Sequence, residues 1–484
     1  MPDRDHARAS TTARLRYVKY CSLLALAVTL GACTSGPDYR APSLPTDASG
    51  PFVTHAADTD PGNAPPAEWW KLYDDPVLDR LIQEALSANT DLRVAVANLE
   101  RSRAIYREAR SGLFPSTTVS AGVGYGRDQT TWYGPGQAPA QWNDSAGLNV
   151  SYELDLFGRV RRDIEAAQDD TGVVAADYDA TKVIVVAETT RAYVDACALG
   201  ASIDVARSSI DLASHSLRII SSEEQAGSAS HLDVERAGES LAQAMAALPP
   251  LQGQRETSLF ELAALMGRTP SQVPEEARSC NSVPKMAGVL PVGDGASLLR
   301  RRPDVRKAER QLAADTARIG VATADLYPRI MLGASGNYLR NDYLRGDRTL
   351  SFSFGPLISW TFPNIMVTRS RIAQAKAQSA ASLASFDGAV LTALKESEQA
   401  LTAYSAALEQ RDALAEARDR AGHAFTLADQ RYRAGSISYL DVLVAQTTLI
   451  DDEAQVAAAD ERVGSARVSV FKALGGGWER PSSP

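Results

Sequence analysis

Residues 91–115 read DLRVAVANLERSRAIYREARSGLFP, and residues 304–328 read DVRKAERQLAADTARIGVATADLYP. The two stretches align without a gap and share residues along their whole length. A second match follows later in the chain, where AGSASHLDV at 226–234 corresponds to AGSISYLDV at 434–442. Self-similarity at a fixed spacing indicates a duplicated structural unit. The chain therefore contains two copies of a unit of about 200 residues.

Long helices are predicted in both copies. From 199 to 220, apolar side chains recur at alternating steps of three and four residues, which is typical of a coiled coil. The stretch from about 160 to 225 lacks proline and predicts one helix of about 66 residues, about 100 Å long. The alternative is a helix broken several times inside a compact bundle. Pro249 and Pro250 predict a break in the helix that follows the first AGSASHLDV turn.

Segments with strict two-residue alternation lie between these helices. Every even residue from 146 to 156 is apolar, whereas the odd residues between them are glycine or polar. In the second copy the even-numbered positions hold the large apolar residues Phe352, Phe354, Ile358, Trp360 and Phe362. This pattern predicts strands with one apolar and one polar face, paired as hairpins at about 115–157 and 328–363. Strands of about ten residues are long enough to cross a bilayer when tilted.

Four strands are too few to close a barrel. An open sheet edge cannot lie in lipid, because its N–H and C=O groups would have no partners. Either the hairpins pack in a soluble sandwich, or several chains pool their strands. Three chains would supply about twelve strands, with the polar face toward water and the aromatic face toward lipid. The expected fold class is therefore mostly α, with duplicated long helices, two hairpins per chain and a trimeric 12-stranded barrel.

Composition excludes several classes of protein. The chain has 484 residues, of which 44% are hydrophobic and 23% charged, so it is neither a disordered tail nor a small disulfide module. A formal net charge of −9 argues against a nucleic-acid partner, which would require a basic surface. No run of about 18 apolar residues is present, so a membrane-spanning helix is not expected.

The N-terminus has the pattern of an export signal. Five basic residues precede or flank an apolar run at 21–30, which predicts a signal peptide at 1–32. Leu30-Gly31-Ala32-Cys33 looks like a bacterial lipobox, so Cys33 is expected to become a lipidated N-terminus that carries acyl chains such as palmitate. The alternative is an ordinary signal peptide with a chance cysteine. No Asp follows Cys33, which by resemblance to other lipoproteins favours the outer membrane.

Two further cysteines lie in the mature chain. Export takes Cys197 and Cys280 to an oxidising compartment, where a disulfide can form. The sequence leaves open whether they are bridged or remain as two buried thiols.

Several short strings together resemble one family. They are CTSGPDYRAP at 33–42, WWKLYDDP at 69–76, ELDLFG at 153–158, RPD at 302–304, LYP at 326–328 and KALGGGW at 472–478. Their order, combined with the duplication, resembles the TolC-like outer membrane factors, in particular the OprM/NodT lipoprotein branch. The resemblance covers essentially the whole mature chain.

This resemblance implies a function as well as a fold. It implies a homotrimer in the outer membrane with a long α-helical periplasmic tunnel. Its implied partners are a periplasmic adaptor (membrane fusion) protein, an inner-membrane RND transporter and outer-membrane lipid. The expected activity is passive, gated export of small molecules. The alternatives are the duct of a type I protein secretion system, an exported coiled-coil structural lipoprotein and a lipoprotein hydrolase.

The duplicated turns at 226–234 and 434–442 are the candidate functional site. Gly227 and Gly435 would permit a positive φ where one helix ends, and Ser230 or Ser438 could cap the next helix. One interpretation is a pair of plain helix turns, in which the aspartates of the two turns favour a helix N-terminus.

The resemblance implies a second interpretation, in which these turns form the periplasmic mouth. Asp233 and Asp441 would constrict or select at the entrance, and Tyr432 would hold neighbouring helices together. Leu440 would stand at a hydrophobic constriction. Three chains would bring six carboxylates around one axis, where they would attract cations.

No arrangement of residues points to catalysis. The five histidines are scattered without the spacing of a metal site, and the serines have no paired base. We therefore expect no enzymatic activity, no metal and no cofactor apart from the lipid on Cys33. The expected segments are a signal peptide at 1–32, an extended segment at 33–75, repeat 1 at 76–267, a linker at 268–298, repeat 2 at 299–475 and a tail at 476–484.

Overall fold

The computed structural model describes residues 34–54, 56–127, 134–286, 288–362 and 365–477. The predicted signal peptide and the predicted lipidation site Cys33 lie outside the described residues. None of the helices in the described part is both long and apolar enough to cross a membrane.

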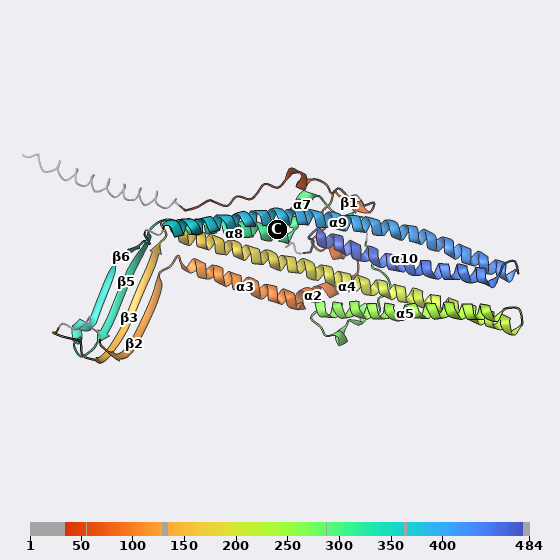
Figure 1. The fold of residues 1–484 in the computed structure, drawn as a ribbon, viewed down its shortest axis with the longest axis horizontal. Helices are drawn as coiled ribbons and strands as arrows, with labels where there is room; N and C mark the ends of the chain where they lie inside the picture. Colours follow the sequence, from red (N-terminus) through yellow and green to blue (C-terminus); the bar gives the residue numbers. More distant parts are fainter. Residues whose placement is uncertain (1–33, 55, 128–133, 287, 363–364, 478–484) are drawn as a thin grey trace, which may run out of the picture. The chain divides into compact units, whose positions relative to one another are not determined.

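Two compact units make up the chain. The first consists of Met1–Ala41, Glu100–Val173 and Ala308–Ser385, and the second of Pro42–Leu99, Val174–Lys307 and Phe386–Pro484. The first unit holds the sheet and the second holds the ends of the long helices (Figure 1).

Each copy of the repeat forms the same series of elements, which is helix, hairpin, long helix, turn and helix. The helices are α2 Pro76–Ala88, α3 Thr90–Ser111, α4 Arg159–Gln225, α5 His231–Leu265, α6 Glu275–Arg278, α7 Gly295–Arg301, α8 Pro303–Ala324, α9 Ile365–Arg433 and α10 Tyr439–Ala473. The strands are β1 Thr59–Asp60, β2 Ser116–Gly126, β3 Gln141–Leu154, β4 Leu290–Pro291, β5 Arg329–Arg340 and β6 Leu350–Ser359. Short 3-10 helices are η1 Thr46–Ser49, η2 Trp69–Tyr73, η4 Pro270–Gln272 and η5 Gly346–Thr349.

The long helices are continuous. Helix α4 has 67 residues and α9 has 69, which confirms the prediction of one long helix and excludes a helix broken several times. The predicted break at Pro249 and Pro250 is wrong, because α5 runs through both residues. Each proline removes a hydrogen bond to the carbonyl four residues earlier. Since this side of α5 is exposed in the chain, water can bond to the freed carbonyls of Met245 and Ala246.

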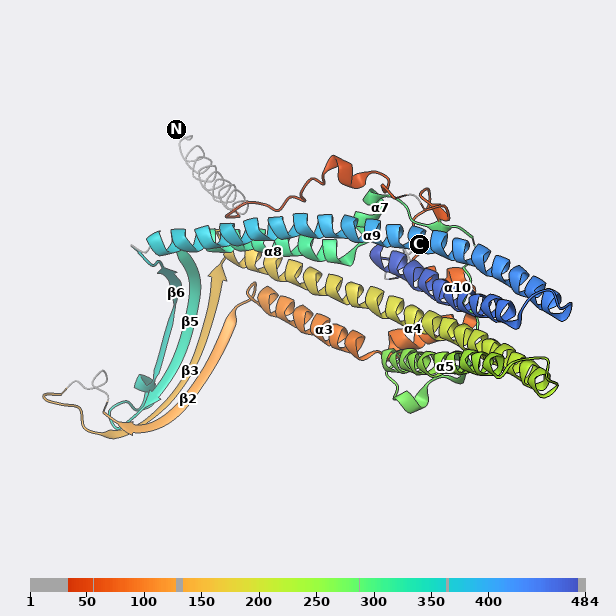
Figure 2. The same cartoon turned by 45° about the vertical axis from the view of Figure 1, so that its right-hand side comes forward.

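The predicted strands form one four-stranded antiparallel sheet in the order β2-β3-β5-β6 (Figure 2). The register preserves the alternation of the sequence, since Val119 lies opposite Leu148 and Ala334 lies opposite Phe354. The other face is polar and is linked across strands by hydroxyl pairs. Ser116 and Ser151 lie 2.8 Å apart, as do Ser335 and Ser353.

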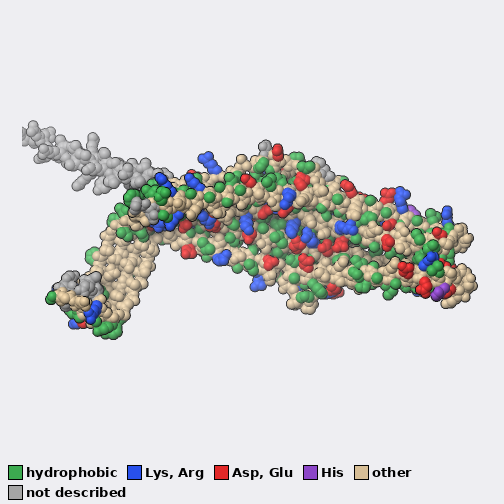
Figure 3. Space-filling model, in the orientation of Figure 1, with side chains coloured by type: hydrophobic (Ala, Val, Ile, Leu, Met, Phe, Trp, Pro, Cys, Tyr) green, Lys and Arg blue, Asp and Glu red, His purple; other side chains and the backbone are tan. Residues whose placement is uncertain are grey.

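Nothing in the described part of the chain covers the apolar face of the sheet. Phe352 is 90% exposed and Phe354 is 79% exposed. The face of the sheet that is visible in Figure 3 is mostly tan and shows almost no charged atoms, whereas red and blue atoms are spread along the helices. Exposed apolar patches of this kind mark a surface that contacts a partner or a membrane.

The core of the second unit contains residues of the motifs at 69–76, 302–304 and 472–478. Trp69 is fully buried and stacks on Phe471, with ring centroids 4.5 Å apart. A Cβ atom at Gly476 would lie 2.8 Å from the Trp69 ring, so this glycine permits the close approach. Arg302 is buried and donates to the carbonyl of Ala473 at 2.7 Å and to the carboxylate of Asp304 at 2.6 Å.

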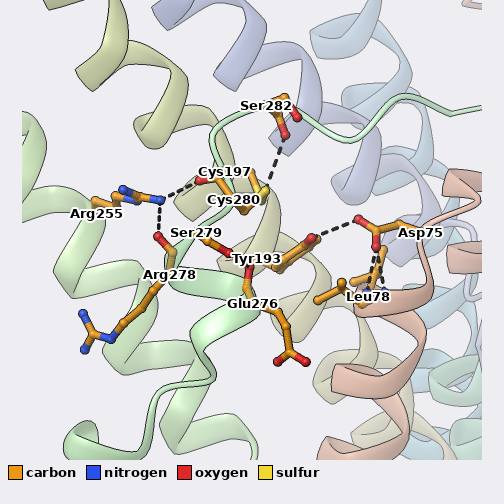
Figure 4. Close-up of a disulfide and its surroundings, with 11 residues drawn as sticks. Asp75, Leu78, Tyr193, Cys197, Arg255, Glu276, Arg278, Ser279, Cys280 and Ser282 are labelled. Carbon is orange, nitrogen blue, oxygen red and sulfur yellow. Dashed lines mark hydrogen bonds between the residues drawn. A yellow bond between two sulfur atoms is a disulfide. The ribbon is translucent and has the colours of Figure 1, made fainter. Parts of the chain in front are cut away.

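Cys197 and Cys280 form a disulfide, which answers the question that the sequence left open (Figure 4). Cys197 is buried on α4, and Cys280 lies in the stretch between the two copies. The guanidinium of Arg255 on α5 donates to the carbonyls of Arg278 at 2.7 Å and Cys280 at 2.5 Å. The disulfide and Arg255 together attach this stretch to both α4 and α5.

Asp195 lies near the disulfide, on the same helix, and is poorly solvated. Its Oδ1 atom is buried and has no hydrogen-bond partner among the described residues. Burial and the neighbouring Glu461 carboxylate raise the pKa of Asp195 to about 7. An unfolded aspartate has a pKa of about 3.9, so between about pH 4 and pH 7 the folded state holds a proton on Asp195 that the unfolded state has lost. The free energy of unfolding therefore decreases as the pH rises through this range.

Substitution Asp195→Asn should therefore raise the melting temperature, and the increase should be larger at pH 8 than at pH 4.5. Thermal unfolding of the detergent-purified protein at the two pH values measures the difference. The control is Asp211→Asn, an exposed aspartate on the same helix, for which little pH-dependent change is expected. An equal shift at both pH values would contradict the assigned burial cost.

Candidate functional site at the helix turns

The two duplicated turns close the ends of α4 and α9 in the same way. Gly227 has φ 76° and Gly435 has φ 71°, both in the left-handed region that glycine adopts without strain. In the first turn the amide of Ser228 donates to a carbonyl of the last helical turn at 2.9 Å, and the amide of Gly227 does so at 2.8 Å. Ser436 and Gly435 repeat both bonds at the same distances. This is the Schellman arrangement, which satisfies the free carbonyls of a helix end.

The predicted gate aspartates cap the helices that follow. The Asp233 carboxylate accepts from the hydroxyl of Ser230 at 2.6 Å and from its amide at 3.3 Å. The Asp441 carboxylate accepts from the hydroxyl of Ser438 at 2.7 Å and from its amide at 3.0 Å. Both turns are capping boxes, with a negative charge at the positive end of a helix dipole. The interpretation of these residues as helix caps therefore describes their role within one chain.

Tyr432 connects the two turns. Its hydroxyl donates to the carboxylate of Glu223, so the last turn of α9 is bonded to the last turn of α4. Its ring also meets the ring of Tyr439 edge-on, with centroids 5.6 Å apart. Burial and the hydrogen bond to Glu223 raise the pKa of Tyr432 above that of an ordinary phenol. Figures 1 and 2 both show the two turns at the same end of the second unit.

A small apolar core lies beneath this connection. It combines residues of all four helices and consists of buried Ile220, Ala237, Tyr439, Val442 and Leu443 with their half-buried neighbours. Gln446, which is fully buried, accepts a hydrogen bond from the Ser216 hydroxyl at 2.7 Å and links α10 to α4. Two part-buried hydrogen bonds, from Tyr432 to Glu223 and from Ser216 to Gln446, and a limited apolar contact therefore help to hold the turns together.

Leu440 is exposed at the start of α10. Its side chain is 42% exposed, and its repeat counterpart Leu232 is 58% exposed at the start of α5. Leu232 was missed by the sequence reasoning, although the alignment of the two turns places it opposite Leu440. Glu223 and Gln446 were also missed. No local motif marks either residue, because their partners lie more than 200 positions away in the sequence.

The described residues contain no group of His, Cys, Asp or Glu side chains arranged to hold a metal ion. His231 lies in the first turn, where its ring is 3.0 Å from the Glu224 carboxylate and largely exposed.

Substitution Tyr432→Phe keeps the ring but removes the hydroxyl that bonds Glu223. A hydrogen bond to a charged group contributes about 1.5–3 kcal/mol, so the turns should separate more often. Trypsin cleavage after Arg431 and Arg433, both exposed beside Tyr432, should become several-fold faster. Glu223→Gln retains an acceptor and should have a smaller effect. Equal cleavage rates in the wild type and Tyr432→Phe would show that this hydrogen bond does not hold the turns.

The sequence of this chain matches a known protein family and several characterised relatives. The family model described as outer membrane efflux protein matches residues 81–268 and 296–476, which are the two copies of the repeat. The solvent efflux pump outer membrane protein SrpC of Pseudomonas putida is 32% identical over 458 residues, covering 93% of this chain and 96% of SrpC. Nodulation protein T of Rhizobium leguminosarum bv. viciae is 29% identical over 460 residues, covering 94% and 93% of the two chains.

A solved structure agrees with these matches. The outer-membrane channel OprN superposes with a TM-score of 0.84 at 34% identity, covering 92% of this chain and 100% of OprN. These findings confirm the resemblance to the OprM/NodT branch and the predicted location in the outer membrane. The family match extends over both copies of the repeat, including the two turns, and the chain belongs to the outer membrane efflux protein family.

Proposed function

We propose that this chain forms, as a homotrimer, the outer-membrane duct of a tripartite efflux system that exports small molecules. The observation that carries the proposal is the four-stranded sheet, which has an uncovered apolar face and two edge strands, β2 and β6. Pairing β6 of one chain with β2 of the next would give twelve strands and remove both edges. The polar face would then line a water-filled passage, and the aromatic face would contact lipid.

The duct would continue through the helices into the periplasm. We propose a periplasmic adaptor protein and an inner-membrane RND transporter as partners, by analogy with relatives whose names describe solvent and toluene efflux pumps. A passive passage binds no cofactor and catalyses no reaction, so the chain would have neither. A purely structural coiled-coil role is less favoured, because it would leave the apolar face of the sheet without a function.

We also propose that Cys33 carries the lipid anchor. Support comes from the residues that directly follow it in the first unit. The amide of Ser35 donates to the carbonyl of Phe157 at 3.0 Å, just beyond the end of β3. Arg162, which is buried, donates to the Ser35 carbonyl at 3.2 Å and to the Asp38 carboxylate at 2.5 Å. These bonds would hold a lipid on Cys33 close to the helix-proximal end of the sheet, where the bilayer surface would lie.

The turns at 226–234 and 434–442 would form the gated entrance. Three copies of Asp233 and Asp441 would create a negatively charged ring, and Leu440 would narrow it. The bond from Tyr432 to Glu223 would favour the closed state. Opening would separate the turns, while Gly227 and Gly435 would keep each turn intact. The aspartates would thus both cap their own helices and select ions at the mouth.

Planar-bilayer recording tests the duct and its charge ring together. The detergent-purified wild type should be trimeric and should conduct with a preference for cations. Asp233→Asn combined with Asp441→Asn keeps a capping side chain but removes the charge, so the cation-to-anion permeability ratio should fall several-fold. An aqueous-soluble monomer without conductance would contradict the duct itself.

The matched control separates charge from capping. Ser230→Ala combined with Ser438→Ala removes the capping hydroxyls but leaves both carboxylates in place. This variant should be less stable by about 1 kcal/mol per cap and should retain the wild-type ion preference. If the wild type conducts but the aspartate variant keeps the same permeability ratio, the charge ring is wrong and the duct stands.

A further inference from the structure

A cavity of about 320 Å³ lies in the first unit, where the ends of β5 and β6 meet the first turns of α9. Its walls include charged side chains and hydroxyl groups, which the duct function leaves without a role. The residues that matter here are Asp325, Arg329, Ser359, Trp360, Thr361 and Arg371.

The charges around this cavity do not balance. Asp325 is the carboxylate of the lining, and Arg329 and Arg371 are its two guanidinium groups. Arg329 pairs with Asp325 through one contact of 2.7 Å, in which its guanidinium donates a hydrogen bond to the carboxylate. The nearest approach of Arg371 to the same carboxylate is 3.9 Å, which is too long for a hydrogen bond. One carboxylate thus faces two arginines, and the side chain of Arg371 remains 62% exposed.

Hydroxyl donors complete the lining. Ser359 lies directly opposite Arg329 in the strand register, so its hydroxyl and the guanidinium belong to the same cross-strand pair. Thr361 lies two residues after Ser359 and so continues the same side of the alternation. Trp360 lies between them, on the opposite side of the alternation, and contributes an aromatic ring to the lining. Guanidinium groups combined with hydroxyl donors are the groups with which proteins bind phosphate and carboxylate oxygens.

We propose that this cavity binds a phosphate-bearing anion, with Arg371 as its main ligand and Arg329, Ser359 and Thr361 as additional donors. The excess positive charge favours an anion, and the forked guanidinium of Arg371 matches two phosphate oxygens. Asp325 holds Arg329 in place and leaves Arg371 available. The proposal concerns a binding site and does not depend on export.

The phosphate group has two sources. The rings of Trp360 and Phe362 are tilted relative to each other, with centroids 5.1 Å apart, and both residues continue the apolar alternation of β6, which suits the boundary between a bilayer and water. Because Ser359 and Thr361 continue the polar alternation and Trp360 the apolar one, the cavity borders both faces of the sheet. A phospholipid headgroup would present a phosphate from the lipid side, and a free phosphate would enter from the water side. Both use the same chemistry at Arg371, and the experiment below distinguishes them.

The test uses the full-length protein in detergent, with two probes. Inorganic phosphate is titrated while tryptophan fluorescence is followed, and Trp360→Phe identifies the part of the signal that comes from the cavity. Phosphatidylglycerol is added in mixed micelles, and native mass spectrometry counts the lipids retained on the protein. In each assay Arg371→Gln should weaken binding at least tenfold, and Arg371→Lys should have an intermediate effect.

Arg369→Gln is the matched control, because Arg369 is an exposed arginine two residues earlier on α9 that does not line the cavity. It should change binding less than twofold. Retention of phosphatidylglycerol that depends on Arg371 identifies a lipid site, and a phosphate response without lipid retention identifies a site for soluble anions. No binding of either probe, or equal losses in Arg369→Gln and Arg371→Gln, overturns the proposal. Circular dichroism of each variant verifies that the helices are intact.

Discussion

Strands β2 and β6 each have one side without a partner strand in a single chain, and the proposed assembly depends on this constraint. Each strand pairs along one side with its neighbour, and its other side forms an edge of the sheet. In water such an edge is solvated, but in lipid each unpaired peptide group costs several kcal/mol. In lipid, a sheet with an apolar face and two free edges would therefore need strands from other chains. The family to which the chain belongs, and its location in the outer membrane, fit this requirement.

The two copies of the repeat have the same series of elements but differ in the side chains at their turns. Both turns have a glycine in the left-handed region and a serine–aspartate capping box, so each forms from its own local sequence. The contact between them is asymmetric, because Tyr432 of the second copy bonds Glu223 of the first. A stable turn joined to its neighbour by few contacts can move as a rigid piece, which is what a gate requires.

Most of the fold was predictable because its signals are periodic. Two-residue alternation gave the faces of β2, β3, β5 and β6, and proline-free heptads gave α4. The break at Pro249 was expected because proline removes a helix hydrogen bond and its ring clashes with the preceding turn. The helix nevertheless continues, and this side of α5 is open to water, which can bond to the freed carbonyls. At the site, the caps were predictable from neighbouring residues. Glu223 and Gln446 were not, since each bonds a residue that only the folded chain brings near.

Interchain cysteine cross-linking reports whether β6 of one chain pairs with β2 of the next. Ser116→Cys lies at the start of β2 and Ser359→Cys at the end of β6, both at the end of the sheet that joins the helices. If β6 of one chain pairs antiparallel with β2 of the next, the double variant should oxidise to a covalent trimer. A second pair combines Thr118→Cys with Leu357→Cys. The crossed pairs, Ser116→Cys with Leu357→Cys and Thr118→Cys with Ser359→Cys, cover shifts in register. Cross-linked trimers should form from at least one pair, and none should form from the single variants. Only monomers from every pair, in protein extracted from the outer membrane, would contradict this pairing.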